Sequence, residues 1–307
     1  MNTRAVAVIG AGLIGQSWTA LFAAHGYDVI AWDSAKEWQE RYFTKSGEAL
    51  AQLRALGVAG RNGRVRAAET LEQAVSKAFW IQESVPESVP LKLELYKQVE
   101  TAAPDDAILA SSTSSLTWSM LASGLQTPSR FVTAHPFNPP HLMPLVEVFA
   151  PSADARETAR KFYDSLGRHT VFLDREAVGH IANRLASALW REAVSLVEEG
   201  VASVSAIDAA LVHGPGLRWS VIGAHMAYHL GGGSGGIEAY LKHLGSSQER
   251  RWASLGTPKL TPELSQRIID GVLEEASGRS ISDLEAERDT ALLRMLAAKA
   301  GGNANGA

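Results

Sequence analysis

A glycine-rich turn near the N-terminus constrains the fold of this chain more than any other feature. The apolar run Ala5–Ile9 predicts a strand that leads into Gly10-Ala11-Gly12-Leu13-Ile14-Gly15. The following residues predict a helix over Leu13–His25 and a second strand over Tyr27–Trp32. A glycine turn between a strand and a helix, followed by another strand, is typical of dinucleotide-binding domains.

The three glycines of this turn have separate physical tasks. Gly10 allows a sharp turn after the strand, and Gly12, which lacks a Cβ, allows a pyrophosphate to approach the start of the helix. Gly15 allows that helix to pack close to the sheet. The predicted pyrophosphate site therefore comprises Gly10, Gly12, Leu13, Ile14 and Gly15, although a glycine-rich turn without a nucleotide stays an alternative.

An acidic residue follows the second predicted strand at the position that contacts a ribose in such domains. Asp33 lies roughly twenty residues beyond the glycine turn, where a carboxylate accepts hydrogen bonds from the adenosine ribose hydroxyls. Its charge would repel a 2′-phosphate, and Ser34 and Ala35 follow it without a neighbouring arginine. The pattern favours NAD over NADP.

Composition excludes several other classes of function. The chain has 307 residues, which suggests about two domains, and a net charge of −4, which does not favour nucleic acid or anionic membranes as partners. The absence of cysteine excludes disulfides, thiolate metal sites and a cysteine nucleophile, and we predict no metal centre. Residues 1–4 leave no room for a signal peptide and no apolar run is long enough to span a membrane, so we expect a cytoplasmic protein.

Strands and helices alternate through the first half of the chain. Such alternation with apolar strands predicts a mostly parallel sheet covered on both faces, which is an α/β Rossmann-type domain over residues 1–178. Only helical patterns follow, so residues 179–300 are predicted to form an all-α domain, with a flexible tail over 301–307. The remaining strands are predicted at Phe79–Gln82, Ala107–Ser111, Phe131–His135, Leu145–Phe149 and Thr170–Leu173.

Residues at the carboxyl ends of such strands form the ligand site. A run of hydroxyl residues, 111–115, follows one predicted strand, and His135 ends the next. Rigid prolines then return the chain to a strand in which Glu147 lies among apolar residues. A buried carboxylate is costly without a partner, and the histidine at the end of the neighbouring strand is the obvious one. A His–Glu pair of this kind can act as a general base.

Four motifs in order resemble the 3-hydroxyacyl-CoA dehydrogenase family. They are Ser111-Ser112-Thr113-Ser114-Ser115-Leu116, His135-Pro136-Phe137-Asn138-Pro139, Leu145-Val146-Glu147-Val148 and Ile181-Ala182-Asn183-Arg184-Leu185. The resemblance covers both predicted domains. It implies NAD-dependent oxidation of an L-3-hydroxy substrate, with hydride transfer from C3 to the nicotinamide.

The resemblance also implies a role for each matching residue. His135 would be the general base, and Glu147 would orient it. Ser114 and Asn183 would hydrogen-bond the reacting oxygen and the substrate. The remaining matching residues, Glu87, Lys92 and Ser112, would lie along the cofactor.

Departures from the acyl-CoA enzymes indicate a branch that acts on small polar 3-hydroxy acids such as carnitine or gulonate. Val178 and His180 replace the proline and phenylalanine of the acyl-CoA enzymes before Asn183. Arg218 would bind the free carboxylate of such a substrate bidentately, although a helix cap or a surface ion pair is an alternative. Trp219 is a candidate for cation–π contact with a trimethylammonium group, as are Trp190 and Trp118, unless they belong to the core.

Two other functions stay open from the sequence. One is dehydrogenation of a short-chain L-3-hydroxyacyl-CoA thioester, and the other is NAD binding in a structural role without catalysis. The resemblance implies a homodimer formed through the helical domain, where the predicted helix His180–Glu199 offers apolar positions.

Overall fold

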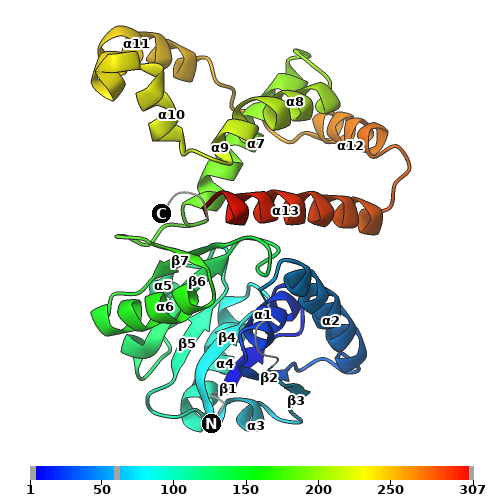
Figure 1. Ribbon diagram of the computed structural model, residues 1–307, viewed down its shortest axis with the longest axis vertical. Helices are drawn as coiled ribbons and strands as arrows, with labels where there is room; N and C mark the ends of the chain where they lie inside the picture. The colour runs from blue at the N-terminus through cyan, green and yellow to red at the C-terminus, as the bar shows by residue number, and fades with distance from the viewer. Residues whose placement is uncertain (1–4, 59–62, 304–307) are drawn as a thin grey trace. The chain divides into compact units, whose positions relative to one another are not determined.

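The chain forms two compact units in this computed structural model, which describes residues 5–58 and 63–303 (Figure 1). One unit comprises the residues up to Arg184 together with those from Glu287 onward, and the other comprises Leu185–Ala286. The predicted boundary at residue 178 assigns all later residues to the second domain, whereas the residues from Glu287 onward belong to the first unit. The side-chain amide of Gln52 donates to Asp289 Oδ2 at 3.1 Å and contributes to this arrangement.

The first unit is built on an eight-stranded sheet in the order β3-β2-β1-β4-β5-β6-β7-β8. All neighbouring strands are parallel except β6 and β7, so the predicted mostly parallel Rossmann-type sheet is confirmed. The strands are β1 Ala5–Ile9, β2 Asp28–Trp32, β3 Val65–Ala67, β4 Ala78–Glu83, β5 Ile108–Ser111, β6 Phe131–Pro136, β7 Leu145–Phe149 and β8 His169–Phe172.

Helices cover both faces of this sheet because alternate strand residues point to opposite sides. Val6 and Val8 pack with helices α1, α2 and α6, whereas Ala7 and Ile9 pack with α3, α4 and α5. These helices are α1 Leu13–Ala24, α2 Gln39–Ala55, α3 Leu71–Val75, α4 Val89–Ala102, α5 Trp118–Ala122 and α6 Ala153–Ser165. Both apolar faces are thereby removed from water, as a parallel sheet requires.

The second unit contains only helices and irregular segments among the residues that the structure describes. Its helices are the rest of α7 Ala182–Glu198, α8 Val204–Leu211, α9 Leu217–Trp219, α10 Ala224–Gly231, α11 Gly236–Ala253, α12 Pro262–Ala276 and the start of α13 Ile281–Asn303. The predicted all-α character is therefore confirmed. The predicted flexible tail starts inside α13, while residues 1–4 and 304–307 lie outside the described residues.

None of the described helices combines the length and hydrophobicity that crossing a bilayer requires. Across residues 5–58 and 63–303, no cluster of three or more histidine, aspartate or glutamate side chains could hold a metal ion.

Candidate active site

A cavity of about 990 Å³ lies in the first unit, at the carboxyl ends of its strands. It runs from Asp33 after β2 to His135 in β6, which are separated by β1, β4 and β5 in the sheet. Four strand spacings correspond to about 19 Å, a length that suits an extended ligand. Its lining includes the predicted residues Gly10, Gly12, Ile14, Asp33, Glu87, Lys92, Ser112, Ser114, His135 and Asn183.

The glycine turn has the geometry expected of a phosphate site. Gly10 has φ +103°, and a Cβ there would lie 2.6 Å from the backbone of Ser84. A Cβ on Gly15 would lie 1.9 Å from the carbonyl oxygen of Gly10. A Cβ on Gly12 would meet no protein atom within 4 Å, and helix α1 begins there without a side-chain cap. The open space and the uncapped N–H groups fit a pyrophosphate.

Asp33 is tied to the turn that it was predicted to accompany. Its Oδ2 accepts a hydrogen bond from the Ala11 N–H at 2.6 Å, and its Oδ1 accepts one from the Ala35 N–H at 2.8 Å. Each carboxylate oxygen can accept a further bond, so Asp33 retains the capacity to bind ribose hydroxyls. The acid therefore also holds the turn in place.

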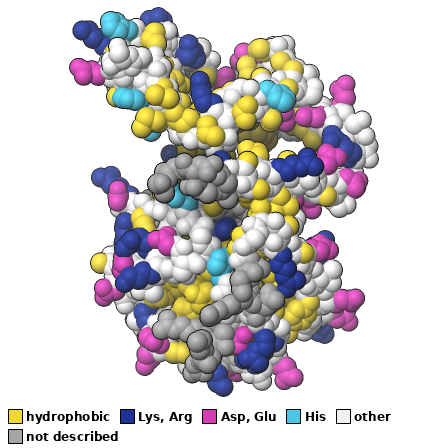
Figure 2. Space-filling view, viewed as in Figure 1, with side chains coloured by type: hydrophobic (Ala, Val, Ile, Leu, Met, Phe, Trp, Pro, Cys, Tyr) yellow, Lys and Arg dark blue, Asp and Glu magenta, His cyan; other side chains and the backbone are white. Residues whose placement is uncertain are grey.

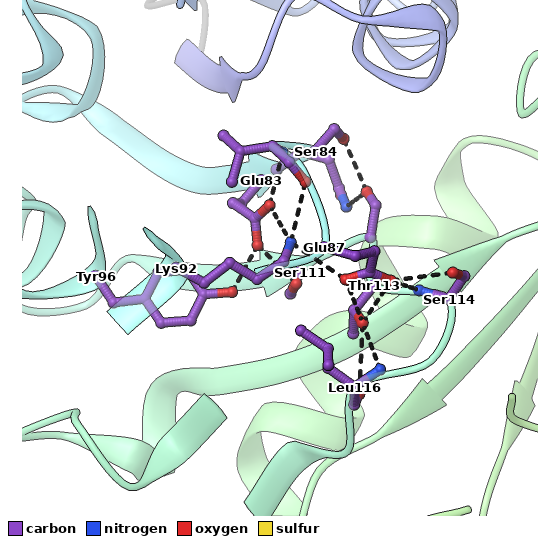
Figure 3. A network of polar contacts seen from close by, with 12 residues as sticks. Glu83, Ser84, Glu87, Lys92, Tyr96, Ser111, Thr113, Ser114 and Leu116 are labelled. Atoms are coloured by element: carbon purple, nitrogen blue, oxygen red, sulfur yellow. Dashed lines mark hydrogen bonds and ion pairs between the residues drawn. The ribbon is translucent and has the colours of Figure 1, made fainter. Parts of the chain in front are cut away.

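A buried ionic network includes Lys92, which is one of the residues that line the cavity (Figure 3). Glu83 Oε1 accepts from Lys92 Nζ at 2.6 Å and from the Val85 N–H at 2.7 Å. Its Oε2 accepts from the Tyr96 hydroxyl at 2.5 Å and from the Ser111 hydroxyl at 2.6 Å. Four donors compensate this carboxylate for its burial, so the charge is held in a fixed position.

Lys92 extends this network to the rim of the cavity. Its ammonium lies 3.8 Å from Glu87 Oε2, and Glu87 accepts hydrogen bonds from the Thr113 hydroxyl and from both the N–H and the hydroxyl of Ser114. Burial alone would raise the pKa of Glu87, but these donors and the Lys92 charge hold it below its usual value. An ionised Glu87 therefore fixes the loop that carries Ser114.

Ser112 is held in the same loop by three side chains. Its Oγ lies 3.2 Å from Trp18 Nε1, 2.9 Å from Gln82 Nε2 and 2.9 Å from Ser84 Oγ. Ser112 is held by these three side chains and the backbone of Ser114 by Glu87, so two residues of the hydroxyl run have fixed positions before any ligand binds. Contact of Ser112, Glu87 and Lys92 with the cofactor stays a prediction.

His135 and Glu147 face each other across the antiparallel pair β6–β7. The two residues are direct register partners, and His135 Nδ1 lies 2.9 Å from Glu147 Oε2. Glu147 Oε1 accepts from the N–H groups of Ile181 at 2.8 Å and Ala182 at 2.9 Å, at the start of α7. Burial would raise the pKa of Glu147, but the hydrogen bonds from His135, Ala182 and Ile181 outweigh it and lower the value.

This pairing determines which imidazole nitrogen is available for chemistry. An ionised Glu147 accepts the Nδ1–H of His135, so the neutral ring has its lone pair on Nε2. Nε2 lies 3.4 Å from Asn183 Nδ2, and both His135 and Asn183 line the cavity. The arrangement can accept a proton from a bound hydroxyl.

The remaining predicted site residues do not line the cavity. Leu13, Gly15 and Glu147 support the cavity without lining it. Arg218 and Trp219 lie on α9 in the second unit and are exposed, so their role in substrate binding stays a prediction. Trp118 donates through Nε1 to the Phe131 carbonyl at 2.9 Å, which is the structural role considered as its alternative.

Two contacts of the site were not predicted from the sequence, the Glu83–Lys92 ion pair and the His135–His180 stack. Glu83 ends an apolar strand, and that position could have indicated a buried acid with a partner. The stacking of His180 on His135, with ring centroids 4.9 Å apart, had no local signal because 45 positions separate them in the chain (180 − 135).

Comparison with known proteins identifies the family of the chain. Residues 5–177 match the family model described as 3-hydroxyacyl-CoA dehydrogenase, NAD binding domain, and residues 179–281 match the model of the C-terminal domain. The chain belongs to the 3-hydroxyacyl-CoA dehydrogenase family. Its first domain therefore takes NAD as cofactor, and the protein is an NAD-dependent oxidoreductase.

The family relatives include curated proteins of similar length. An L-carnitine dehydrogenase of Streptomyces coelicolor is 43% identical over 302 residues, which cover 97% of this chain and 95% of the relative. An L-carnitine dehydrogenase of Pseudomonas aeruginosa is 39% identical, covering 96% of this chain and 94% of the relative. Among solved structures, an NAD-dependent dismutase named 5-formyl-3-hydroxy-2-methylpyridine 4-carboxylic acid 5-dehydrogenase superposes with a TM-score of 0.83 at 29% identity, covering 96% and 98% of the two chains.

Two alanine substitutions distinguish the ligand-facing glycine from the packing glycine. Gly12→Ala places its methyl group in open space, so we expect the free energy of unfolding to change by no more than about 1 kcal/mol. The same methyl would obstruct the pyrophosphate and raise the NAD dissociation constant by about tenfold or more. Gly15→Ala is the control, since its methyl meets the Gly10 carbonyl and should lower the free energy of unfolding by about 1–3 kcal/mol. Urea unfolding and NAD titration measure both, and unchanged NAD affinity in Gly12→Ala would contradict the assignment.

Proposed function

We propose that this protein oxidises the 3-hydroxyl group of a small polar L-3-hydroxy acid to the 3-keto acid, with L-carnitine as the favoured substrate. The observation that carries the proposal is the group formed by His135, Glu147 and Asn183 at one end of a cavity whose other end is the Asp33 site. The relatives named L-carnitine dehydrogenases support the choice of substrate.

His135 is the general base in this proposal. Its Nε2 takes the hydroxyl proton of the substrate, while Glu147 holds the Nδ1–H and stabilises the imidazolium that results. NAD, held by Asp33 and the glycine turn, would supply the redox chemistry as the acceptor of the hydride from C3. Asn183 donates a hydrogen bond to the oxygen as it changes from hydroxyl to carbonyl, and Ser114 does so once its hydroxyl turns from Glu87 to the substrate.

The polar network around Glu87 prepares the oxygen-binding side of the site. Glu87 fixes the Ser114 N–H at 2.5 Å and the Ser114 hydroxyl at 3.0 Å, and so limits the rotation of that side chain before substrate binds. The backbone of Ser114 is thereby held in place, while its hydroxyl must turn from Glu87 to donate to the substrate oxygen.

A free carboxylate distinguishes the favoured substrates from thioesters. Arg218 offers a guanidinium that can bind a carboxylate through two hydrogen bonds, and Trp219 offers an aromatic face for a quaternary ammonium group. A short-chain 3-hydroxyacyl-CoA presents neither group at the same position, so the two substrate classes can be separated by direct comparison.

A substrate panel tests the proposed reaction. NAD reduction is measured with L-carnitine, L-gulonate and L-3-hydroxybutyryl-CoA, and we expect the highest kcat/KM with L-carnitine. His135→Gln should lower kcat by about 10²- to 10⁴-fold, because the general base is lost. Its NAD affinity and folding should stay those of the wild type. A clear preference for the thioester would overturn the substrate class, and NAD binding without oxidation of any panel member would indicate a structural role.

Arg218→Met tests recognition of the carboxylate separately from the chemistry. Loss of a charge-assisted hydrogen-bond pair costs about 1.5–3 kcal/mol, so we expect KM for L-carnitine to rise about tenfold or more. The NAD dissociation constant and the activity with the thioester should not change. An unchanged KM for L-carnitine would remove Arg218 from the substrate site.

We also propose a homodimer formed through the helical unit, in the cytoplasmic compartment expected from the sequence. The described part of this unit buries few large apolar side chains, Val194, Val197 and Leu264. Many others are exposed, and Figure 2 shows hydrophobic side chains gathered on its visible surface. They include Val201, Val212, Val221, Leu230, Leu241, Trp252 and Leu273. Apolar surface of this extent is typical of a protein interface.

The mass in solution tests the dimer. Light scattering after gel filtration should give twice the 32.8 kDa of one chain. Leu241→Glu, at a position 60% exposed in the single chain, should shift the mass towards that of the monomer, whereas Leu13→Glu, 55% exposed in the first unit, should not. A monomeric wild type at micromolar concentration would contradict the proposal.

A further inference from the structure

His180 stacks face to face on the imidazole of His135. The ring centroids lie 4.9 Å apart with an interplanar angle of 16°, and both side chains are buried. His135 lines the cavity, whereas His180 contacts the ring of His135 without lining the cavity. Its position therefore affects the base without requiring contact with the substrate.

The hydrogen bonding of His180 determines its tautomer. Its Nε2 lies 3.1 Å from the carbonyl oxygen of Thr113, and a carbonyl can only accept, so Nε2 carries the hydrogen. Nδ1 is buried and has no hydrogen-bond partner among the described residues. Protonation of Nδ1 would bury a donor without an acceptor, which is costly.

The surroundings of His180 also favour its neutral form. The charged or titratable groups around it are His135 on β6, Glu147 on β7 and Glu87 at the rim of the cavity. Burial and the neighbouring His135 lower the pKa of His180, although the Thr113 hydrogen bond and the two carboxylates act in the opposite direction. His180 therefore presents an uncharged aromatic face to His135.

The backbone at His180 is unfavourable for a residue with a side chain. Its φ is +49°, in the left-handed region that favours glycine, and it follows Gly179 with φ +78°. A non-glycine residue in this region destabilises the backbone and persists only where surrounding contacts determine its conformation. Here the contacts are the stack on His135 and the hydrogen bond to Thr113.

We propose that His180 is a positioning residue that links the base to the oxygen-binding loop. Its ring fixes the plane of His135, and its Nε2–H fixes the carbonyl of Thr113, the residue before Ser114. His180 thereby couples the position of the His135 ring to that of the loop that carries Ser114. The inference rests on the proposed 3-hydroxy acid dehydrogenase function.

Two variants separate the stack from the hydrogen bond. His180→Phe keeps an aromatic ring but has no donor for Thr113, and His180→Gly removes both contacts while accepting φ +49° without strain. We expect kcat to fall about tenfold in His180→Phe and about a hundredfold in His180→Gly, because small displacements of catalytic groups cost such factors. The NAD dissociation constant should stay within about twofold of the wild-type value.

Chemical rescue tests the donor directly. Imidazole added to His180→Gly can fill the vacated space and donate to Thr113, so it should restore part of kcat. 1-Methylimidazole has no N–H and should not restore it, and neither compound should raise the activity of the wild type. Equal rescue by both compounds, or a His180→Phe variant with wild-type kcat and pH profile, would overturn the proposal.

A spectroscopic measurement keeps this inference separate from the proposed reaction. Nitrogen NMR of histidine-labelled wild type at neutral pH should show His180 as the neutral Nε2–H tautomer, with His135 carrying Nδ1–H. In His180→Phe, the His135 Nδ1–H should exchange faster with solvent. A His180 protonated on both nitrogens at neutral pH, or hydrogenated on Nδ1 alone, would overturn the inference even if no substrate were oxidised, whereas inactivity of the wild type alone would count against the proposed function.

Discussion

The buried carboxylate of Glu147 is the interaction on which the rest of the site depends. It lies on β7 at 1% exposure, where an unpartnered charge would be very costly. Two N–H groups at the start of α7 and the Nδ1 of His135 compensate it. One side chain therefore joins the antiparallel strand pair, the start of a helix and His135, the proposed base. The position and tautomer of His135 follow from this packing.

A second set of carboxylates fixes the other side of the site. Glu83 and Glu87 share the Lys92 ammonium, at 2.6 and 3.8 Å, and Glu87 in turn holds the N–H and hydroxyl of Ser114. Donors surround these charges within the first unit, so the polar groups need little rearrangement when a ligand binds. Both sets include residues that line the cavity, and their fixed positions suit the proton transfer that we propose.

The parts of the structure that were predictable from the sequence have local causes. The spacing of the glycines in the turn predicts a dinucleotide site. The cost of burying an unpartnered carboxylate at Glu147 predicts His135 as its partner. The strand Val65–Ala67 was missed because it is a three-residue edge strand with two exposed residues, and it carries no apolar pattern. The Glu83–Lys92 pair, the His135–His180 stack and the return of α13 depend on tertiary contacts, for which a single sequence has no local signal.

Glu147→Gln tests most directly whether this carboxylate controls the base. The Gln oxygen can still accept from Ile181 and Ala182, while its amide group donates to Nδ1 and forces the hydrogen of His135 onto Nε2. We predict that kcat for L-carnitine oxidation falls about 10²- to 10⁴-fold, with NAD affinity unchanged and the folded structure retained by circular dichroism. A variant that keeps wild-type kcat across the pH range would contradict the account.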